Sequence, residues 1–163
     1  MSTKYFPLGK DDLEKLIADY PTPFYLYDEK AIRENARRLC AAFSILPDYK
    51  EHFAVKALPN PYILKILAEE GLGADCSSYP ELLLAEMAGI KGEDIMLTAN
   101  NTPASEFIKA SELGAIINLD DISHISFLEK VLNNSLPQMV SCRYNPGPLK
   151  DGNAIIGKPE EAK

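Results

Sequence analysis

The sequence predicts an α/β fold, namely a partial (β/α)8 TIM barrel with about five barrel strands present. Short apolar runs recur along the chain, and their starts step by 21, 21, 20 and 24 residues. Segments with helical periodicity lie between these runs. Strands that alternate with helices imply a parallel sheet, and short regular units favour a closed barrel over an open sheet. The predicted strands cover residues 53–56, 74–78, 95–99, 115–119 and 139–144.

Prolines and glycines mark the boundaries of the predicted helices. Three helices are expected to begin with proline at the first helical position and to end at a glycine in the left-handed conformation. The prolines are Pro61, Pro80 and Pro103, and the glycines are Gly71, Gly89 and Gly114. This order of proline and glycine fixes the helix ends more closely than periodicity alone.

The first part of the chain departs from this period. It is expected to contain a helix at residues 11–18, a strand at 23–28 and a helix at 29–43. Because the early strand breaks the later repeat, we expect it to belong to another sheet. Residues 1–28 are therefore expected to form one part, an N-terminal helix and strand, and residues 29–163 an incomplete barrel.

The length of the chain is short for a complete barrel. Eight strand and helix units usually take about 250 residues, whereas this chain has 163 and its last residues are polar. We therefore expect either a fragment or a natural truncation.

Composition and charge exclude several classes of protein. With 46% hydrophobic and 25% charged residues, the chain is typical of a globular domain, and its net charge of -7 argues against nucleic-acid binding. No signal peptide and no membrane span is predicted, so we expect a cytoplasmic protein. Cys40, Cys76 and Cys142 are expected to be reduced, and no metal site is predicted because neither CxxC nor paired histidine spacing occurs.

Chemically useful side chains follow the predicted strands, where a barrel assembles its active site. They are Lys56, residues 75–78, Asn100, Asn101, Asp120, Asp121, Arg143 and Asn145. The sequence contains no nucleotide-binding glycine motif, and no Ser/His/Asp set is evident. Lys56 is therefore the main candidate nucleophile.

Each candidate also has a purely structural interpretation. A lysine at the end of a buried strand is usually neutralised, paired or covalently occupied, but it can also extend to solvent. Asp75 can be a turn or pairing residue, and Arg143 can form an ion pair across the barrel mouth. Ser78 and Glu81 have the spacing of a capping box, which is the interpretation we favour for them.

Three strings together resemble a known family. They are Phe-Ala-Val-Lys-Ala-x-Pro-Asn at residues 53–60, Gly-Ala-Asp-Cys-Ser-Ser at 73–78 with Glu81, and Arg-Tyr-Asn-Pro-Gly at 143–147. This combination resembles the amino-terminal barrel of pyridoxal-phosphate-dependent decarboxylases of the alanine racemase-like fold, and diaminopimelate decarboxylases in particular. Residues 22–28 are also similar to that family, in which they contribute to a second, β-rich domain.

The resemblance implies a cofactor and roles for three residues. Lys56 would be the catalytic residue, forming a Schiff base with pyridoxal 5'-phosphate, and Asp75 and Arg143 would belong to the cofactor-binding network. The implied reaction is the decarboxylation of meso-diaminopimelate to lysine, a step of lysine biosynthesis. Ornithine, arginine or carboxynorspermidine are alternative substrates. A small amino acid would thus be the partner, with neither nucleic acid nor membrane, and the full-length form would be a homodimer.

The sequence also departs from the family pattern. The family's ring-stacking histidine, phosphate-binding glycines and acidic group at the pyridine nitrogen would follow residue 163. His124 is predicted on a helix, and Gly147, Gly152 and Gly157 are too widely spaced for the phosphate loop. We therefore expect this chain alone to bind the cofactor weakly and to be inactive. The alternatives are a non-catalytic homologue or partner subunit, and an unrelated α/β domain with a coincidental lysine.

Overall fold

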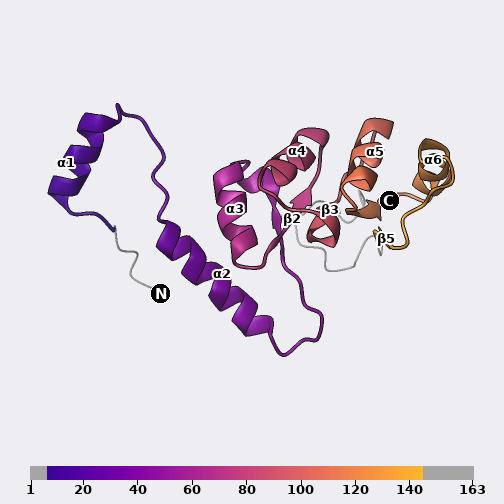
Figure 1. Ribbon diagram of the computed structural model, residues 1–163, viewed down its shortest axis with the longest axis horizontal. Helices are drawn as coiled ribbons and strands as arrows, with labels where there is room; N and C mark the ends of the chain where they lie inside the picture. Colours follow the sequence, from indigo (N-terminus) through magenta and orange to yellow (C-terminus); the bar gives the residue numbers. More distant parts are fainter. Residues whose placement is uncertain (1–6, 145–163) are drawn as a thin grey trace, which may run out of the picture. The chain divides into compact units, whose positions relative to one another are not determined.

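The computed structural model describes residues 7–144 of the chain (Figure 1). The chain divides into two compact units between Pro47 and Asp48. The described helices of the first unit are α1 (Lys10–Asp19) and α2 (Glu29–Phe43). The domain boundary expected after residue 28 stays a prediction.

Helix α2 begins where the sequence predicts. The Asp28 carboxylate accepts a hydrogen bond from the amide of Ala31 at 3.0 Å, which caps the helix. The strand expected over residues 23–28 is wrong, because the structure has no strand there. A strand needs a neighbour to pair its backbone groups, and the described part of the chain offers this segment none.

The second unit is built on five parallel strands that follow one another in the order β1-β2-β3-β4-β5. Parallel strands in sequential order are the arrangement of consecutive units in a (β/α)8 barrel. All five predicted strands are confirmed, and each is shorter than predicted. Their bounds are β1 His52–Ala54, β2 Gly73–Cys76, β3 Ile95–Leu97, β4 Ile116–Leu119 and β5 Val140–Cys142.

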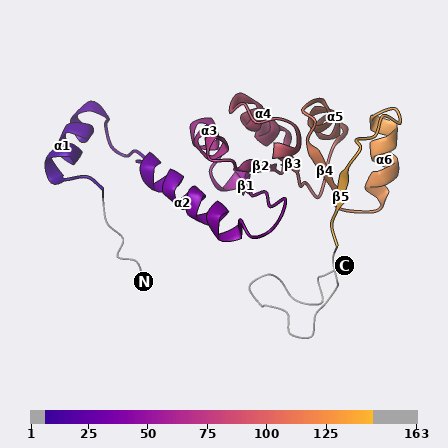
Figure 2. The same ribbon diagram turned by 60° about the horizontal axis from the view of Figure 1, so that its bottom comes forward.

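Four helices connect these strands and follow one another along one face of the sheet (Figures 1 and 2). Two short 3-10 helices, η1 after β1 and η2 before β3, complete the described part of the unit. The bounds are η1 Val55–Ala57, α3 Pro61–Glu69, α4 Tyr79–Met87, η2 Gly92–Asp94, α5 Ala104–Glu112 and α6 Ser123–Val131.

The helix boundaries largely agree with the proline and glycine pattern. The three predicted stop glycines have φ values of 90°, 83° and 70°, as a left-handed helix end requires. Pro61 occupies the first helical position of α3. Pro80 is the second residue of α4 and Pro103 precedes α5 as its N-cap, so these two predictions were off by one residue.

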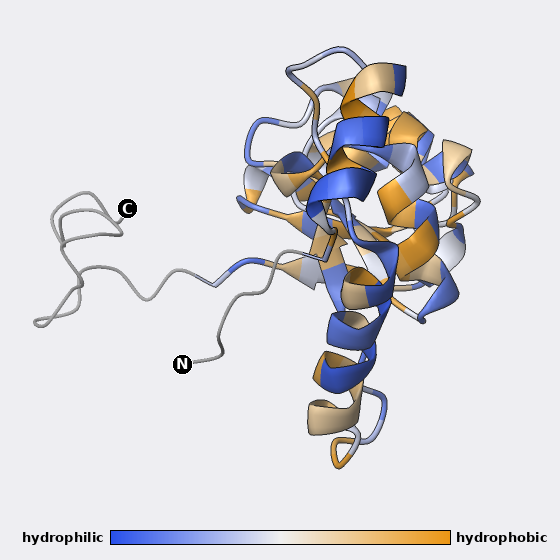
Figure 3. Ribbon diagram, turned by 90° about the vertical axis from the view of Figure 1, so that its left-hand side faces the viewer, coloured by the Kyte–Doolittle hydropathy of each residue, from blue (hydrophilic) through white to orange (hydrophobic). Residues whose placement is uncertain are grey.

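The core lies between the sheet and these helices. Side chains alternate along each strand, and one set is buried against the helices: Ala74, Cys76, Ile95, Leu97, Ile117 and Leu119. Phe107 of α5 is among the largest fully buried side chains. Figure 3 shows that the helices carry both hydrophobic and hydrophilic residues, as expected when one side packs on a sheet and the other meets solvent.

Two exclusions from the sequence can be compared with the structure. In residues 7–144, no helix combines the length and the apolar character that crossing a membrane requires. The same part of the chain contains no group of three or more His, Cys, Asp or Glu that could hold a metal ion. The three cysteines are free, as predicted.

Candidate functional site

Lys56 lies in the short helix η1, directly after β1. Its neighbour Val55 is fully buried, whereas Lys56 itself is exposed. The turn is held by backbone hydrogen bonds from Leu58 to Val55 and from Asn60 to Leu58, at 3.1 and 2.8 Å. The Asn60 side chain then caps α3 by accepting a hydrogen bond from Tyr62 at 3.0 Å. The lysine is thus carried by a well-defined turn at the carboxyl end of a barrel strand.

The exposure of Lys56 agrees with one of the interpretations left open for it, a lysine that extends to solvent. Its expected position at the end of the strand is wrong, because β1 ends at Ala54 and Lys56 lies in the turn that follows. Among the residues that the structure describes, no hydrogen bond or ion pair engages its amine. Hydration explains this, because an exposed ammonium needs no protein partner. The amine is therefore free to react, and it also fits the alternative of a solvated lysine.

Asp75 lies on the neighbouring strand, close to the same edge. It is half-buried and pairs in register with Ala54, two residues before Lys56. Its carboxylate accepts a hydrogen bond from the hydroxyl of Thr98, which follows β3. The structure therefore places the predicted lysine and aspartate on adjacent strand ends.

Two glutamates fix the loop that follows Asp75 and Cys76. Glu81 reaches back to the backbone amide of Ser77 at 2.9 Å and accepts from the hydroxyl of Ser78 at 3.1 Å. The predicted capping box does not form. Glu81 accepts from the amide of Ser77, one residue before the N-cap Ser78, and the Ser78 hydroxyl donates to Glu81 instead of accepting from the helix backbone.

Glu106 caps the same helix from outside. This residue belongs to the first turn of α5, is 8% exposed, and accepts a hydrogen bond from the amide of Tyr79, the first residue of α4, at 2.9 Å. Its second oxygen is buried without a hydrogen-bond partner. Carboxylates are favourable at the positive ends of helices, and the first turns of two adjacent helices surround this one.

Arg143 lies at the other end of the strand order, after β5. Its Nε is 2.6 Å from Oδ1 of Asp120, which follows β4. The two groups form a close ion pair that is not aligned as a hydrogen bond. Arg143 therefore pairs with a residue of the neighbouring strand end, as its structural interpretation predicts. Within the described part of the chain it makes no contact with Asp75, and its role in cofactor binding stays a prediction.

A small hollow of about 290 Å³ opens beside this ion pair, lined by Leu119, Asp120, Asp121, Ile122, Ile125, Cys142 and Arg143. The Asp121 carboxylate bonds to a residue two positions further along the chain. It accepts hydrogen bonds from the amide and hydroxyl of Ser123 at 2.8 and 2.6 Å, and these bonds lower the pKa of its carboxyl. Asp121 is thus a cap for α6.

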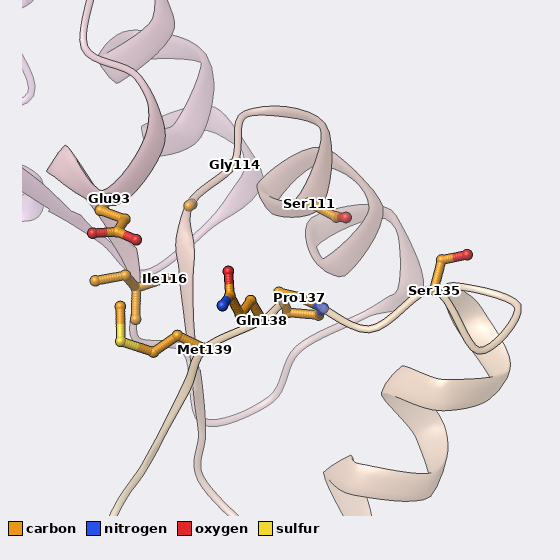
Figure 4. A pocket seen from close by; sticks show the side chains of 9 residues that line it. Glu93, Ser111, Gly114, Ile116, Ser135, Pro137, Gln138 and Met139 are labelled. Carbon is orange, nitrogen blue, oxygen red and sulfur yellow. The ribbon is translucent and has the colours of Figure 1, made fainter.

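A larger hollow of about 700 Å³ lies at the opposite ends of the strands (Figure 4). Its lining includes Glu93, Ile116 and Met139, which precede or begin β3, β4 and β5. Catalytic groups of barrel enzymes gather at the carboxyl ends of the strands, and Lys56 lies there. We therefore place the candidate site at the Lys56 edge, in spite of the larger volume elsewhere.

The side chains at this edge fit parts of a pyridoxal phosphate molecule. An exposed primary amine is the group that an aldehyde requires, and carboxylate and guanidinium groups lie on the same edge of the sheet. A phosphate would need free amides at a helix N-terminus. Of the described helices that follow strands, α3, α4 and α6 already have a first-turn amide bonded to a side chain, that of Asn60, Glu106 or Asp121.

Sequence reasoning missed several polar residues of this edge. Thr98, Asn118, Ser141 and Glu106 were not proposed, although they engage in hydrogen bonds between strands or helices. For Thr98, Asn118 and Ser141 the available signal was a polar residue at every second position near a strand end, whereas Glu106 lies on helix α5. His124 is on helix α6, as predicted. Asn145, Gly147, Gly152 and Gly157 lie outside the described residues.

Comparison with known proteins decides the family. Residues 29–161 match the family described as "Pyridoxal-dependent decarboxylase, pyridoxal binding domain". The chain belongs to the pyridoxal-dependent decarboxylase family. Pyridoxal phosphate is the cofactor of this family. The predicted partial α/β barrel is confirmed by the five-stranded parallel sheet together with the solved decarboxylase structures described below, without the preceding strand that was expected.

Individual members of the pyridoxal-dependent decarboxylase family show how much of the chain is shared. Protein TabA of Pseudomonas amygdali pv. tabaci is 42% identical over 160 residues, which are 98% of this chain and 36% of that protein. The diaminopimelate decarboxylase of Methanothermobacter thermautotrophicus is 38% identical over 140 residues, which are 85% of this chain and 32% of that protein. The chain thus spans about a third of the length of these curated relatives.

Solved structures of decarboxylases agree in fold. The diaminopimelate decarboxylase of M. jannaschi superposes with a TM-score of 0.78 at 26% identity, over 86% of this chain and 34% of that protein. Lysine decarboxylase from Selenomonas ruminantium superposes with a TM-score of 0.69, also at 26% identity, over 80% of this chain and 35% of that one. The decarboxylase family is therefore established, whereas its members differ in substrate.

Proposed function

We propose that this chain provides the lysine-bearing part of a pyridoxal-phosphate-dependent amino-acid decarboxylase that acts on meso-diaminopimelate. Lys56 is proposed as the residue that binds the cofactor. The observation that supports this most is the exposed amine directly after β1, which has no partner among residues 7–144. It lies within the residues that match the pyridoxal-binding domain.

The proposed chemistry begins with the amine of Lys56. This amine would hold the cofactor covalently through the cofactor's aldehyde group. When bound, the cofactor would supply an acceptor for the electron pair that carbon dioxide leaves behind. An exposed amine supports the role of Lys56, because a lysine held in an ion pair would first have to break it.

Asp75 and Arg143 are proposed as cofactor-binding residues. The Asp75 carboxylate is held on the strand beside Lys56 and would face a cationic group of the cofactor. The Arg143 guanidinium is half-exposed and is oriented by Asp120. An oriented guanidinium suits a carboxylate or a phosphate, so Arg143 would contact the anionic part of the cofactor or substrate.

The substrate is the least constrained part of the proposal. Diaminopimelate decarboxylase from M. thermautotrophicus supports meso-diaminopimelate, and lysine biosynthesis is then the pathway. Likeness to a lysine decarboxylase makes related amino acids, including ornithine and arginine, the alternatives. We also propose that the functional form is a cytoplasmic homodimer and that residues 1–28 form a part separate from the barrel.

The experiment uses the longest polypeptide that the gene encodes, supplied with pyridoxal phosphate. Carbon dioxide release is measured from meso-diaminopimelate, L-lysine, L-ornithine and L-arginine, with Lys56→Ala as the inactive control. The proposal predicts the fastest release from meso-diaminopimelate and none in the control. Residues 1–163 alone are expected to show no release. Equal release by the wild type and Lys56→Ala would contradict the role of Lys56.

A second candidate is a cofactor-binding protein without decarboxylase activity. The likeness to Protein TabA, which is 42% identical, leaves this candidate open beside the decarboxylase. This candidate predicts a covalent cofactor adduct at Lys56 without release of carbon dioxide from any of the four amino acids.

A further inference from the structure

The inner side of the sheet carries a polar layer where barrels usually have branched apolar residues. Side chains that alternate with the helix-facing set point to this side. The register pairs Asn118 of β4 with Ser141 of β5, and the serine hydroxyl donates to the asparagine oxygen at 2.9 Å. Thr98 continues the inner positions of β3, two residues beyond Met96.

Asp75 lies one step further from the carboxyl ends of the strands than Thr98, beside Met96. Its partners in register are Ala54 on one side and Met96 on the other, and neither side chain can donate a hydrogen bond to a carboxylate. The Thr98 hydroxyl is the hydrogen-bond donor to Asp75 that the described structure contains. Without it, a half-buried carboxylate would lie between an alanine and a methionine.

Thr98 is itself held in place. Its backbone amide donates to the carbonyl of Cys76 at 2.8 Å, so the main chain of β3 remains bonded to β2 just beyond Asp75. The hydroxyl therefore starts from a fixed position. Asp75 is paired in register with Met96, and Thr98 lies two residues beyond Met96 toward the carboxyl end of β3. The hydrogen bond therefore directs the carboxylate toward the carboxyl ends of the strands, where Lys56 lies.

We propose that Thr98 is a positioning residue, whose hydroxyl holds the Asp75 carboxylate toward the Lys56 end of the sheet. This inference rests on the proposed role of Asp75 in cofactor binding. Thr98 acts only through Asp75 and takes no part in the reaction itself. A hydroxyl suits this task because it leaves the charge of the carboxylate in place.

The test compares Thr98→Val, which removes the hydroxyl at nearly constant volume, with Thr98→Ser, which keeps it. Ser141→Ala is the matched control, since it removes the other side-chain hydrogen bond of the polar layer. The first readout is the side-chain rotamer of Asp75, obtained by NMR from three-bond couplings without cofactor. The second is the dissociation constant of pyridoxal phosphate, with borohydride reduction and peptide mapping at Lys56.

Thr98→Val is expected to fold, to average the Asp75 rotamer and to weaken cofactor binding by about five- to tenfold, the effect of one hydrogen bond. Thr98→Ser and Ser141→Ala should resemble the wild type in both readouts. An unchanged rotamer in Thr98→Val overturns the positioning role. An averaged rotamer with unchanged cofactor binding overturns its link to the cofactor.

The two readouts separate this inference from the proposed function. If the wild type forms no cofactor adduct at Lys56, the proposed function fails and so does the link to the cofactor. The rotamer measurement then still decides whether Thr98 positions Asp75. If a variant unfolds, as seen by amide dispersion in the same NMR spectra, Thr98→Ser supplies the decision: a wild-type rotamer supports the role of the hydroxyl, and an averaged one contradicts it.

Discussion

The carboxylate of Glu106 accepts a hydrogen bond from the backbone amide of Tyr79, which lies 27 positions earlier in the chain, at 2.9 Å. Glu106 belongs to α5 and Tyr79 opens α4, so one buried side chain joins two neighbouring helices. The first amides of a helix have no partner within it. Glu106 thus satisfies one of them and also fixes the loop that follows Asp75.

Glu106→Ala is expected to lower the free energy of unfolding by about 1–3 kcal/mol, because the Tyr79 amide loses its acceptor. Glu106→Gln keeps the acceptor oxygen and loses the charge, so its cost should be smaller. Urea denaturation of the three proteins measures the difference. A wild-type free energy of unfolding in Glu106→Ala would show that the hydrogen bond contributes nothing.

The thiol of Cys76 gives a pH dependence with a defined sign. Burial, and then the charges of Glu81 and Asp75, raise the pKa of Cys76 from 9.0 to about 12. Between these values the unfolded chain loses the proton and the folded protein keeps it. The contribution to stability is therefore complete below pH 9 and falls by about 1.4 kcal/mol for each pH unit above it, until the folded pKa is reached.

Cys76→Ala isolates this effect. The destabilisation by the substitution should be about 1.4 kcal/mol smaller at pH 10 than at pH 8, since only the wild type gains from ionisation when it unfolds. Urea denaturation at both pH values measures it. Leu97→Ala, which removes a buried side chain without a proton, should cost the same at both. If Cys76→Ala lowers the free energy of unfolding by the same amount at pH 8 and pH 10, the fold does not raise the pKa of the thiol.

Gly73, the first residue of β2, is fixed by space and not by its backbone angles. A Cβ atom at this position would overlap the carbonyl oxygen of Asp94 and lie 2.6 Å from Cδ2 of His52. Gly73→Ala is expected to cost about 1–3 kcal/mol, as overpacking in a core does. Thermal unfolding measures this cost.

The His52→Ala background supplies a control for the same position. It removes the side-chain overlap and leaves the Asp94 carbonyl in place, so Gly73→Ala should cost less there without becoming neutral. The two costs together form a double-mutant cycle. A melting temperature of Gly73→Ala equal to that of the wild type would contradict the close approach.

Local rules explain why the strands and helices could be predicted from the sequence. Gly71 and Gly89 end helices because their positive φ values suit glycine, and Asp28 caps α2 through a residue three positions away. Such interactions lie within a few residues and are visible in a sequence. The strand expected at residues 23–28 was wrong because pairing depends on a distant neighbour, which local composition does not reveal.

The candidate site was predictable only in part, for the same physical reason. Lys56 and Asp75 follow or end apolar runs, so the strand pattern places them at one edge. Glu106 could not be found in this way, because it lies on a helix and its partner is 27 positions away. Thr98 lies near a strand end, but its partner is 23 positions away, so the strand pattern does not reveal the bond. The sequence left open whether Lys56 is paired or solvated, because periodicity does not reveal that a 3-10 turn follows β1.

The measurement that tests the central claim most directly is the site of cofactor labelling. The longest polypeptide that the gene encodes is mixed with pyridoxal phosphate, reduced with borohydride and digested, and the modified lysines are identified by mass spectrometry. The account predicts that Lys56 is labelled in preference to the other lysines, and that Lys56→Arg removes this preference. Labelling spread evenly over the lysines, and unchanged in Lys56→Arg, would contradict it.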